Sequence, residues 1–156
     1  MTGLSNDHIQ FIIEYLSEHL DVHTVILFGS AVHEVMRNDS DVDLAFLADE
    51  EFSTYQIFMK AQGLADHLGR EVDLVDFRQA SAVFKAQIVG NGKLLLDNQP
   101  IIRQYAFMRA LKEYALLNEE RKVVLEKNGY EGEITFDWRC NYKQDGDHQT
   151  LHKENT

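Results

Sequence analysis

The most informative stretch of the chain is TVILFGSAVHEVMRNDSDVDLAFL, residues 24–47. It begins with a continuous apolar run, residues 24–28, whose composition is typical of a central strand buried on both faces. Gly29 and Ser30 end that run, and ten residues separate Ser30 from Asp41. The pattern predicts a buried strand, a turn with a short helical segment over residues 31–37, and then a second strand.

Two aspartates open this second strand. Residues 41–47 alternate in character, which places Asp41, Asp43, Ala45 and Leu47 on one face. Two carboxylates on the same side of a strand repel each other unless a cation lies between them. Mg²⁺ is the natural cation, because it prefers oxygen ligands and shares its coordination shell with phosphate and water.

The turn before the aspartates is suited to a phosphate ligand. Gly29 has no β-carbon, so backbone can approach a ligand closely there. Ser30 lies where a helical turn starts, and its hydroxyl together with free backbone N–H groups forms an anion site that a triphosphate would fit. A third carboxylate is expected from a strand over residues 71–77, which offers Asp73 or, on the opposite face, Asp76. Two metal ions bridged by such carboxylates activate an attacking hydroxyl and stabilise a leaving pyrophosphate.

The rest of the chain predicts helices packed on a small mixed β-sheet, an α/β architecture. Further helices are expected over residues 6–20 behind Ser5, over residues 53–68 and over residues 80–90, and a short strand over residues 94–96. Gly69 is expected to stop the second of these helices. Its candidate core positions are Tyr55, Phe58, Met59, Leu64 and Leu68.

A long C-terminal helix begins at Pro100 and runs unbroken to Lys127, about 40 Å. Its apolar positions include Ile101, Tyr105, Met108, Leu111, Ala115, Leu116, Val123 and Val124. These apolar side chains either pack in the core or contact a partner, and the sequence does not decide between the two. We therefore expect residues 1–98 to form the core, residues 99–128 to form a helix available to a partner, and residues 129–156 to form a poorly ordered polar tail.

The composition excludes several classes of function. The formal net charge is −11, and a surface this acidic repels phosphate backbones and anionic lipid. Direct nucleic-acid or membrane binding is therefore not expected, whereas a basic protein partner suits the charge. We expect no signal peptide and no membrane helix. The single Cys140 fits a reducing cytoplasm.

These motifs resemble a known family. The stretch LFGSAVHEVMRNDSDVDLAF matches the G-S-x10-D-x-D pattern of the nucleotidyltransferase superfamily with a polymerase-β-like core. More narrowly, residues 5–128 resemble the minimal nucleotidyltransferase (MNT) antitoxins of HEPN/MNT toxin–antitoxin pairs, including the later motifs REVDLVDFRQAS and QIVGNGKLLLDN.

The resemblance implies a specific activity and specific site residues. Gly29 and Ser30 would anchor the nucleotide phosphates, Asp41 and Asp43 would be metal ligands, and Asp73 would supply the third carboxylate. The implied reaction is the Mg²⁺-dependent transfer of AMP from ATP to a tyrosine hydroxyl of a cognate HEPN ribonuclease toxin, which neutralises the toxin.

Two alternatives remain open at this stage. After Ser30 the chain departs from the common family pattern, with Ala31 and then His33-Glu34-Val35 near a usual glycine position. This departure motivates a second hypothesis, in which a catalytically weak antitoxin occludes the toxin by direct binding. A third hypothesis is adenylylation of a small aminoglycoside-type molecule, for which 156 residues leave little room for an acceptor domain.

Overall fold

The computed structural model describes residues 4–32, 41–127 and 129, without the side chains of Ser30 and Ala31. These residues form the α-helices α1 (Asn6–Leu20), α2 (Thr54–Leu68), α3 (Ala82–Asn91) and α4 (Pro100–Lys127). They also form the strands β1 (Val22–Phe28), β2 (Val42–Ala48), β3 (Val72–Asp76) and β4 (Lys93–Asp97), and the short 3-10 turns η1 (Gly29–Val32) and η2 (Phe77–Gln79). The predicted α/β architecture is confirmed.

Local chemistry explains where the helices begin and end. Helices α1, α2 and α3 each start behind a serine whose side chain accepts a hydrogen bond from a backbone N–H of the first turn. Such caps satisfy backbone donors that a helix leaves unpaired at its N-terminus. Helix α2 ends at Gly69, which adopts a left-handed φ of 68°. The predicted stop at Gly69 is therefore confirmed.

The strands form one mixed sheet in the order β3-β2-β1-β4. Strand β1 pairs antiparallel with both β2 and β4, and β2 pairs in parallel with β3. Every residue of β1 and of β2 is buried, as expected for central strands covered on both faces. Strand β3 therefore lies at one edge of the sheet and β4 at the other.

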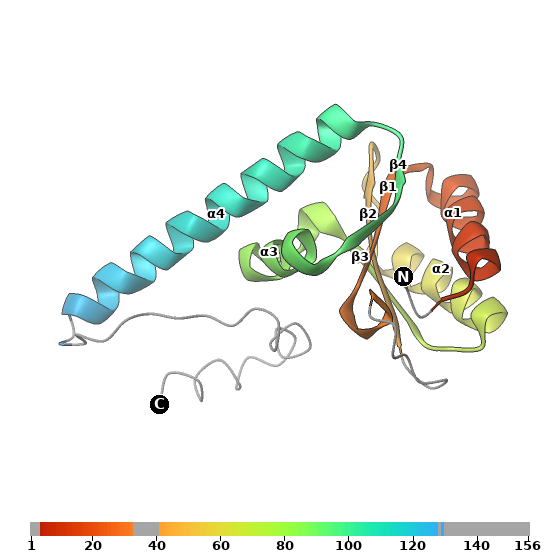
Figure 1. Ribbon diagram of the computed structural model, residues 1–156, viewed down its shortest axis with the longest axis horizontal. Coiled ribbons are helices and arrows are strands. Elements are labelled where there is room, and N and C mark those ends of the chain that lie inside the picture. Colours follow the sequence, from red (N-terminus) through yellow and green to blue (C-terminus); the bar gives the residue numbers. More distant parts are fainter. Residues whose placement is uncertain (1–3, 33–40, 128, 130–156) are drawn as a thin grey trace.

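The two faces of the sheet bury two separate clusters. Helices α1 and α2 cover one face, and α3 with the start of α4 lies on the other (Figure 1). Leu44 and Phe46 pack with the first cluster, whereas Ala45 and Leu47 pack with the second. The predicted alternation along β2 is therefore confirmed, and Asp43 belongs by its position to the face that carries α3.

The predicted core of α2 is partly wrong. Tyr55, Phe58 and Met59 are 70%, 56% and 46% exposed. The buried positions of α2 are Ile57, Ala61, Leu64 and Leu68. Their spacing of four, three and four residues forms one helix face, which turns Tyr55 and Phe58 outward.

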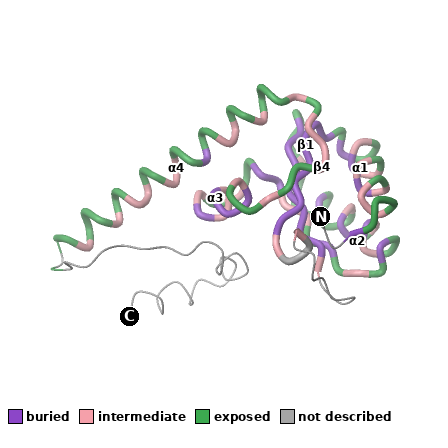
Figure 2. Tube along the Cα trace, viewed as in Figure 1, coloured by how far each residue is buried: buried purple, intermediate pink, exposed green. Residues whose placement is uncertain are grey.

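Helix α4 extends away from the sheet and leaves most of its surface uncovered (Figures 1 and 2). Ala110 is its one buried residue within the described chain. Ile101, Tyr105 and Met108 are each more than 60% exposed, so this part of the apolar stripe is not core. None of the described helices combines the length and apolarity that crossing a membrane requires.

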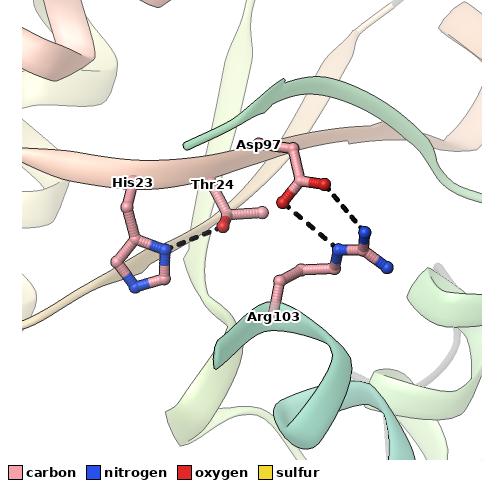
Figure 3. Close-up of polar contacts among 4 residues, drawn as sticks. All are labelled: His23, Thr24, Asp97 and Arg103. Atoms are coloured by element: carbon pink, nitrogen blue, oxygen red, sulfur yellow. Dashed lines mark hydrogen bonds and ion pairs between the residues drawn. The ribbon is translucent and has the colours of Figure 1, made fainter. Parts of the chain in front are cut away.

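A two-bond ion pair fixes the start of α4 against the sheet (Figure 3). The Nη2 and Nε atoms of Arg103 donate to the two carboxylate oxygens of Asp97 at 2.7 and 3.3 Å. Next to Asp97 in the sheet, the Nδ1 atom of His23 lies 2.8 Å from the hydroxyl oxygen of buried Thr24. Burial lowers the pKa of His23. The fork geometry of the guanidinium thus orients the first turns of α4.

Candidate active site

The first component of the site is the turn after β1. Gly29 follows the strand directly and has a φ of +73°. This left-handed conformation is strained for residues that carry a β-carbon, so glycine is favoured here. Ser30 is the second residue of η1, and the role predicted for its hydroxyl stays a prediction. Residues 33–40, which hold most of the predicted helical turn and the departures at His33-Glu34-Val35, lie outside the described residues.

The second component is a pair of aspartates on neighbouring strands. Asp43 of β2 is directly opposite Asp73 of β3 in the parallel register. Residues paired in this way project their side chains from the same face of a sheet. On its other side Asp43 pairs with Phe28, the last residue before Gly29. The structure therefore brings Asp43 and Asp73 together and places them beside the glycine turn.

The two carboxylates differ in their surroundings. Asp43 is 2% exposed, and Asp73 is exposed to solvent. Both line one cleft of about 940 Å³. Asp41, the third predicted ligand, immediately precedes β2, is half-buried, and does not line this cleft. The structure thus brings two of the three predicted acids, Asp43 and Asp73, to the cleft, whereas Asp41 is not among its lining residues.

The structure distinguishes between the two candidates for the third carboxylate. Asp76 is 5% exposed, and its carboxylate caps η2 by accepting a hydrogen bond from the backbone N–H of Arg78 at 3.1 Å. Burial raises the pKa of Asp76. Its position in β3 alternates with that of Asp73, so the two aspartates face opposite sides of the sheet. Only Asp73 shares a face with Asp43.

The cleft itself was not predicted from the sequence. One wall comes from α2, including Ile57, Phe58 and Asp66, and the other from β3. Phe28 and Phe84 also line it, and their rings meet edge to face at 5.5 Å. The aromatic residue Phe58 was the available signal in the sequence, but the apolar pattern of residues 53–68 placed it in the core.

The charge of the cleft is strongly negative. Among the described residues, Asp43, Asp66, Glu71 and Asp73 line it, together with one basic residue, Arg70. Such a lining attracts cations and basic groups and repels phosphates away from any bound cation. The acidic surface predicted from the net charge thus includes the cleft that holds the aspartate pair.

The aspartates of the site have the right type of donor atom for a divalent metal, but their side chains are not arranged as a complete set of ligands. Among the residues that the structure describes, no group of three His, Cys, Asp or Glu side chains gathers closely enough to hold a metal ion. Asp43 and Asp73 nevertheless supply carboxylate oxygens from one face of adjacent strands, which is the donor type that Mg²⁺ prefers. The chemistry of the donors therefore fits magnesium, with Asp41 the nearest further acid in the sequence.

Comparison with known proteins agrees with this arrangement. Residues 10–101, which span the whole sheet, match the family described as polymerase beta nucleotidyltransferase. The chain therefore belongs to this nucleotidyltransferase family.

Within that family the chain groups with the MNT antitoxins. It is 33% identical over 116 residues to the protein adenylyltransferase MntA of Shewanella oneidensis, covering 74% of this chain and 83% of that relative. A crystal structure of the MntA–HepT toxin–antitoxin superposes with a TM-score of 0.67 at 28% identity, covering 81% of this chain and all of the other. A toxin–antitoxin structure with AMP-PNP gives a TM-score of 0.69 at 31% identity, over 78% of this chain and 98% of the other.

A further structure holds the tri-AMPylated HEPN toxin of Shewanella oneidensis in complex with its MNT antitoxin. It superposes with a TM-score of 0.68 at 27% identity, over 81% of this chain and all of the other. The predicted fold and family are therefore confirmed. The individual roles of Gly29, Ser30, Asp41, Asp43 and Asp73 stay predictions.

Proposed function

We propose that this chain transfers AMP from ATP to a tyrosine hydroxyl of a cognate HEPN toxin and thereby neutralises the toxin. The observation that carries the proposal is the in-register pair of Asp43 and Asp73 beside the turn at Gly29. The similarity to MntA and to an MNT antitoxin bound to an AMPylated HEPN toxin supports the choice of reaction and partner.

Each predicted residue has a defined part in this reaction. The backbone at Gly29 and the hydroxyl of Ser30 bind the triphosphate. The tyrosine oxygen attacks the α-phosphorus, a new P–O bond forms, and the bond from that phosphorus to the oxygen bridging to the β-phosphate breaks. Pyrophosphate leaves, and the phenolic proton passes to Asp73, whose exposure allows the proton to continue to solvent.

Divalent cations complete the proposed site. Asp41, Asp43 and Asp73 would hold two Mg²⁺ ions, which neutralise the triphosphate and stabilise the leaving pyrophosphate when bound. Asp43 is buried in the sheet, so its backbone is held by β1 and β3 on either side. Positioning and charge neutralisation then supply most of the rate, as is usual in phosphoryl transfer.

Helix α4 is the second proposed functional region. We assign residues 1–98 to the catalytic core and residues 99–128 to contact with the toxin, because the apolar side chains of α4 are exposed. An exposed apolar stripe on a projecting helix is typical of an interaction surface. The predicted tail beyond residue 129 lies outside the described residues. We place the reaction in the cytoplasm, in keeping with the single Cys140, since a reducing compartment keeps a lone thiol unpaired.

The proposal is tested by intact-mass analysis of the toxin after incubation with this chain, ATP and Mg²⁺. The wild type is expected to add one or more AMP groups. Asp43→Asn or Asp73→Asn should slow the addition about 100-fold or more, since each removes a charge needed in the transition state. Asp76→Asn is the matched control, because Asp76 lies in the same strand but faces away and asparagine also caps turns. Equal rates for all three variants would refute the assigned roles.

Neutralisation by binding alone is the second candidate, and the exposed stripe of α4 favours it. The double variant Asp41→Asn with Asp43→Asn separates the two candidates. If cells producing the toxin remain protected by this variant at normal expression, contact suffices and AMP transfer is dispensable. If protection is lost while the complex still forms, catalysis is required.

A further inference from the structure

The cleft beside the aspartates runs along β3, which forms one edge of the sheet among the residues that the structure describes. Residues 71–75 all line it without interruption. Because side chains of a strand alternate between two faces, an unbroken run of lining residues means that the cleft meets the strand at its edge. Within the described chain, β3 is an edge strand that pairs only with β2. Its outer backbone groups are thus available to another extended segment.

The opposite wall offers apolar contacts. Phe58 is 56% exposed and lines the cleft, as do Ile57 and Ala61 of the same helix. An exposed aromatic ring beside an open strand edge is a suitable contact for a side chain of an added strand. Recognition by strand addition combines backbone hydrogen bonds with such side-chain contacts.

The charge of the cleft indicates what kind of segment it accepts. Asp66 and Glu71 are exposed and line it. Glu71 immediately precedes β3, and β2 separates β3 from β1 and the turn at Gly29. A nucleotide triphosphate is repelled by this lining, whereas a basic peptide is attracted. The part of the cleft that Asp66 and Glu71 line therefore suits the acceptor rather than ATP.

We propose that this cleft binds the acceptor segment of the toxin as an extended strand along the outer edge of β3. Basic side chains of that segment lie opposite Asp66 and Glu71, and its tyrosine hydroxyl reaches Asp73. The proposal rests on the proposed adenylyltransferase function and adds to it the surface that selects the acceptor. This surface is distinct from the stripe of α4.

Substitutions on the wall of the cleft test the proposal. Phe58→Ala, and the double variant Asp66→Lys with Glu71→Lys, should each raise the KM for the toxin about ten-fold. The kcat should stay within about two-fold of wild type, because neither change touches the aspartate pair. Phe58→Ala, which changes no charge, should also leave the affinity for ATP within about two-fold. The effect of the double variant should shrink at high salt, where exposed charges are screened.

Matched controls exclude general effects of the substitutions. Tyr55→Ala removes a ring from the same helix that is 70% exposed and does not line the cleft. Glu18→Lys reverses an exposed charge on α1. Both controls should leave the KM for the toxin unchanged, and melting temperatures of all variants confirm that they fold.

A binding measurement separates failure of this proposal from failure of the proposed function. Toxin affinity is measured with AMP-PNP present, so that no AMP transfer is needed. Weaker toxin binding by Phe58→Ala but not by Tyr55→Ala supports the docking surface even if the wild type modifies no toxin. If the cleft variants bind toxin as the controls do, or if they lose ATP affinity ten-fold, the proposal is overturned.

Discussion

Gly29→Ala is the most informative single substitution, because the same residue serves both the fold and the predicted phosphate site. After the substitution, an alanine with a β-carbon must adopt the φ of +73° that Gly29 has. The left-handed conformation costs an L-residue about 1–2 kcal/mol. This cost should appear as a lower free energy of unfolding and a melting temperature lower by about 2–8 °C per kcal/mol.

Gly69→Ala provides the matched control for backbone strain. Gly69 has a φ of +68°, and a β-carbon built there meets nothing within 4 Å. The unfolding free energies of the two variants, measured by urea denaturation, should therefore fall by similar amounts. Only Gly29→Ala should also weaken binding of ATP, by about ten-fold or 1.4 kcal/mol, because its β-carbon lies where backbone would approach the phosphates.

Two results would refute this reasoning. Equal affinities of the two alanine variants for ATP, measured by titration with a fluorescent nucleotide, would show that the turn is not the phosphate site. A wild-type unfolding free energy for Gly29→Ala would show that the turn tolerates a β-carbon. Gly29→Asn should regain part of the lost stability, since asparagine enters the left-handed region more readily than alanine.

Three further predictions concern the fold. Gly92→Ala should lower the unfolding free energy by about 1–3 kcal/mol, because the new β-carbon would lie 2.4 Å from the Ile88 carbonyl oxygen and 2.5 Å from the Ile26 side chain; an unchanged urea midpoint would contradict this. Gln87→Met should raise the unfolding free energy by about 1 kcal/mol. The side chain of Gln87 is 2% exposed, and both of its polar atoms lack hydrogen-bond partners among the described residues. Calorimetry would show whether the melting temperature rises, as expected, or falls. Burial lowers the pKa of His23 in the folded chain, so the unfolded chain binds more protons. Stability should be full above about pH 6.5 and fall as the pH drops through that value, and His23→Gln should flatten this dependence.

The sequence predicted the features that depend on local periodicity. Strand β1 was predicted from a continuous apolar run, and strand β2 was predicted from the alternating character of residues 41–47. The start of α4 at Pro100 was predicted because proline fits the first turn of a helix. Helix α2 was predicted, but its buried face was not. The small side chain of Ala61 gives a weak apolar signal beside the large rings of Tyr55 and Phe58.

Features that depend on contacts between distant segments could not be predicted in the same way. The parallel pairing of β2 with β3 sets Asp73 opposite Asp43, and no pattern within either strand specifies that register. The choice of Asp73 over Asp76 therefore came from the family resemblance. The cleft also escaped prediction, since its walls come from α2 and from the edge of β3.

The alignment of β2 with β3 has a consequence for how activity is lost. A slip of one residue between these strands would turn Asp73 to the opposite side and separate the carboxylates, although the sheet could keep nearly all of its hydrogen bonds. Chains trapped in that misaligned form during refolding would look native by circular dichroism yet be inactive. Specific activity therefore reports correct strand alignment, which spectroscopic measures of secondary structure cannot detect.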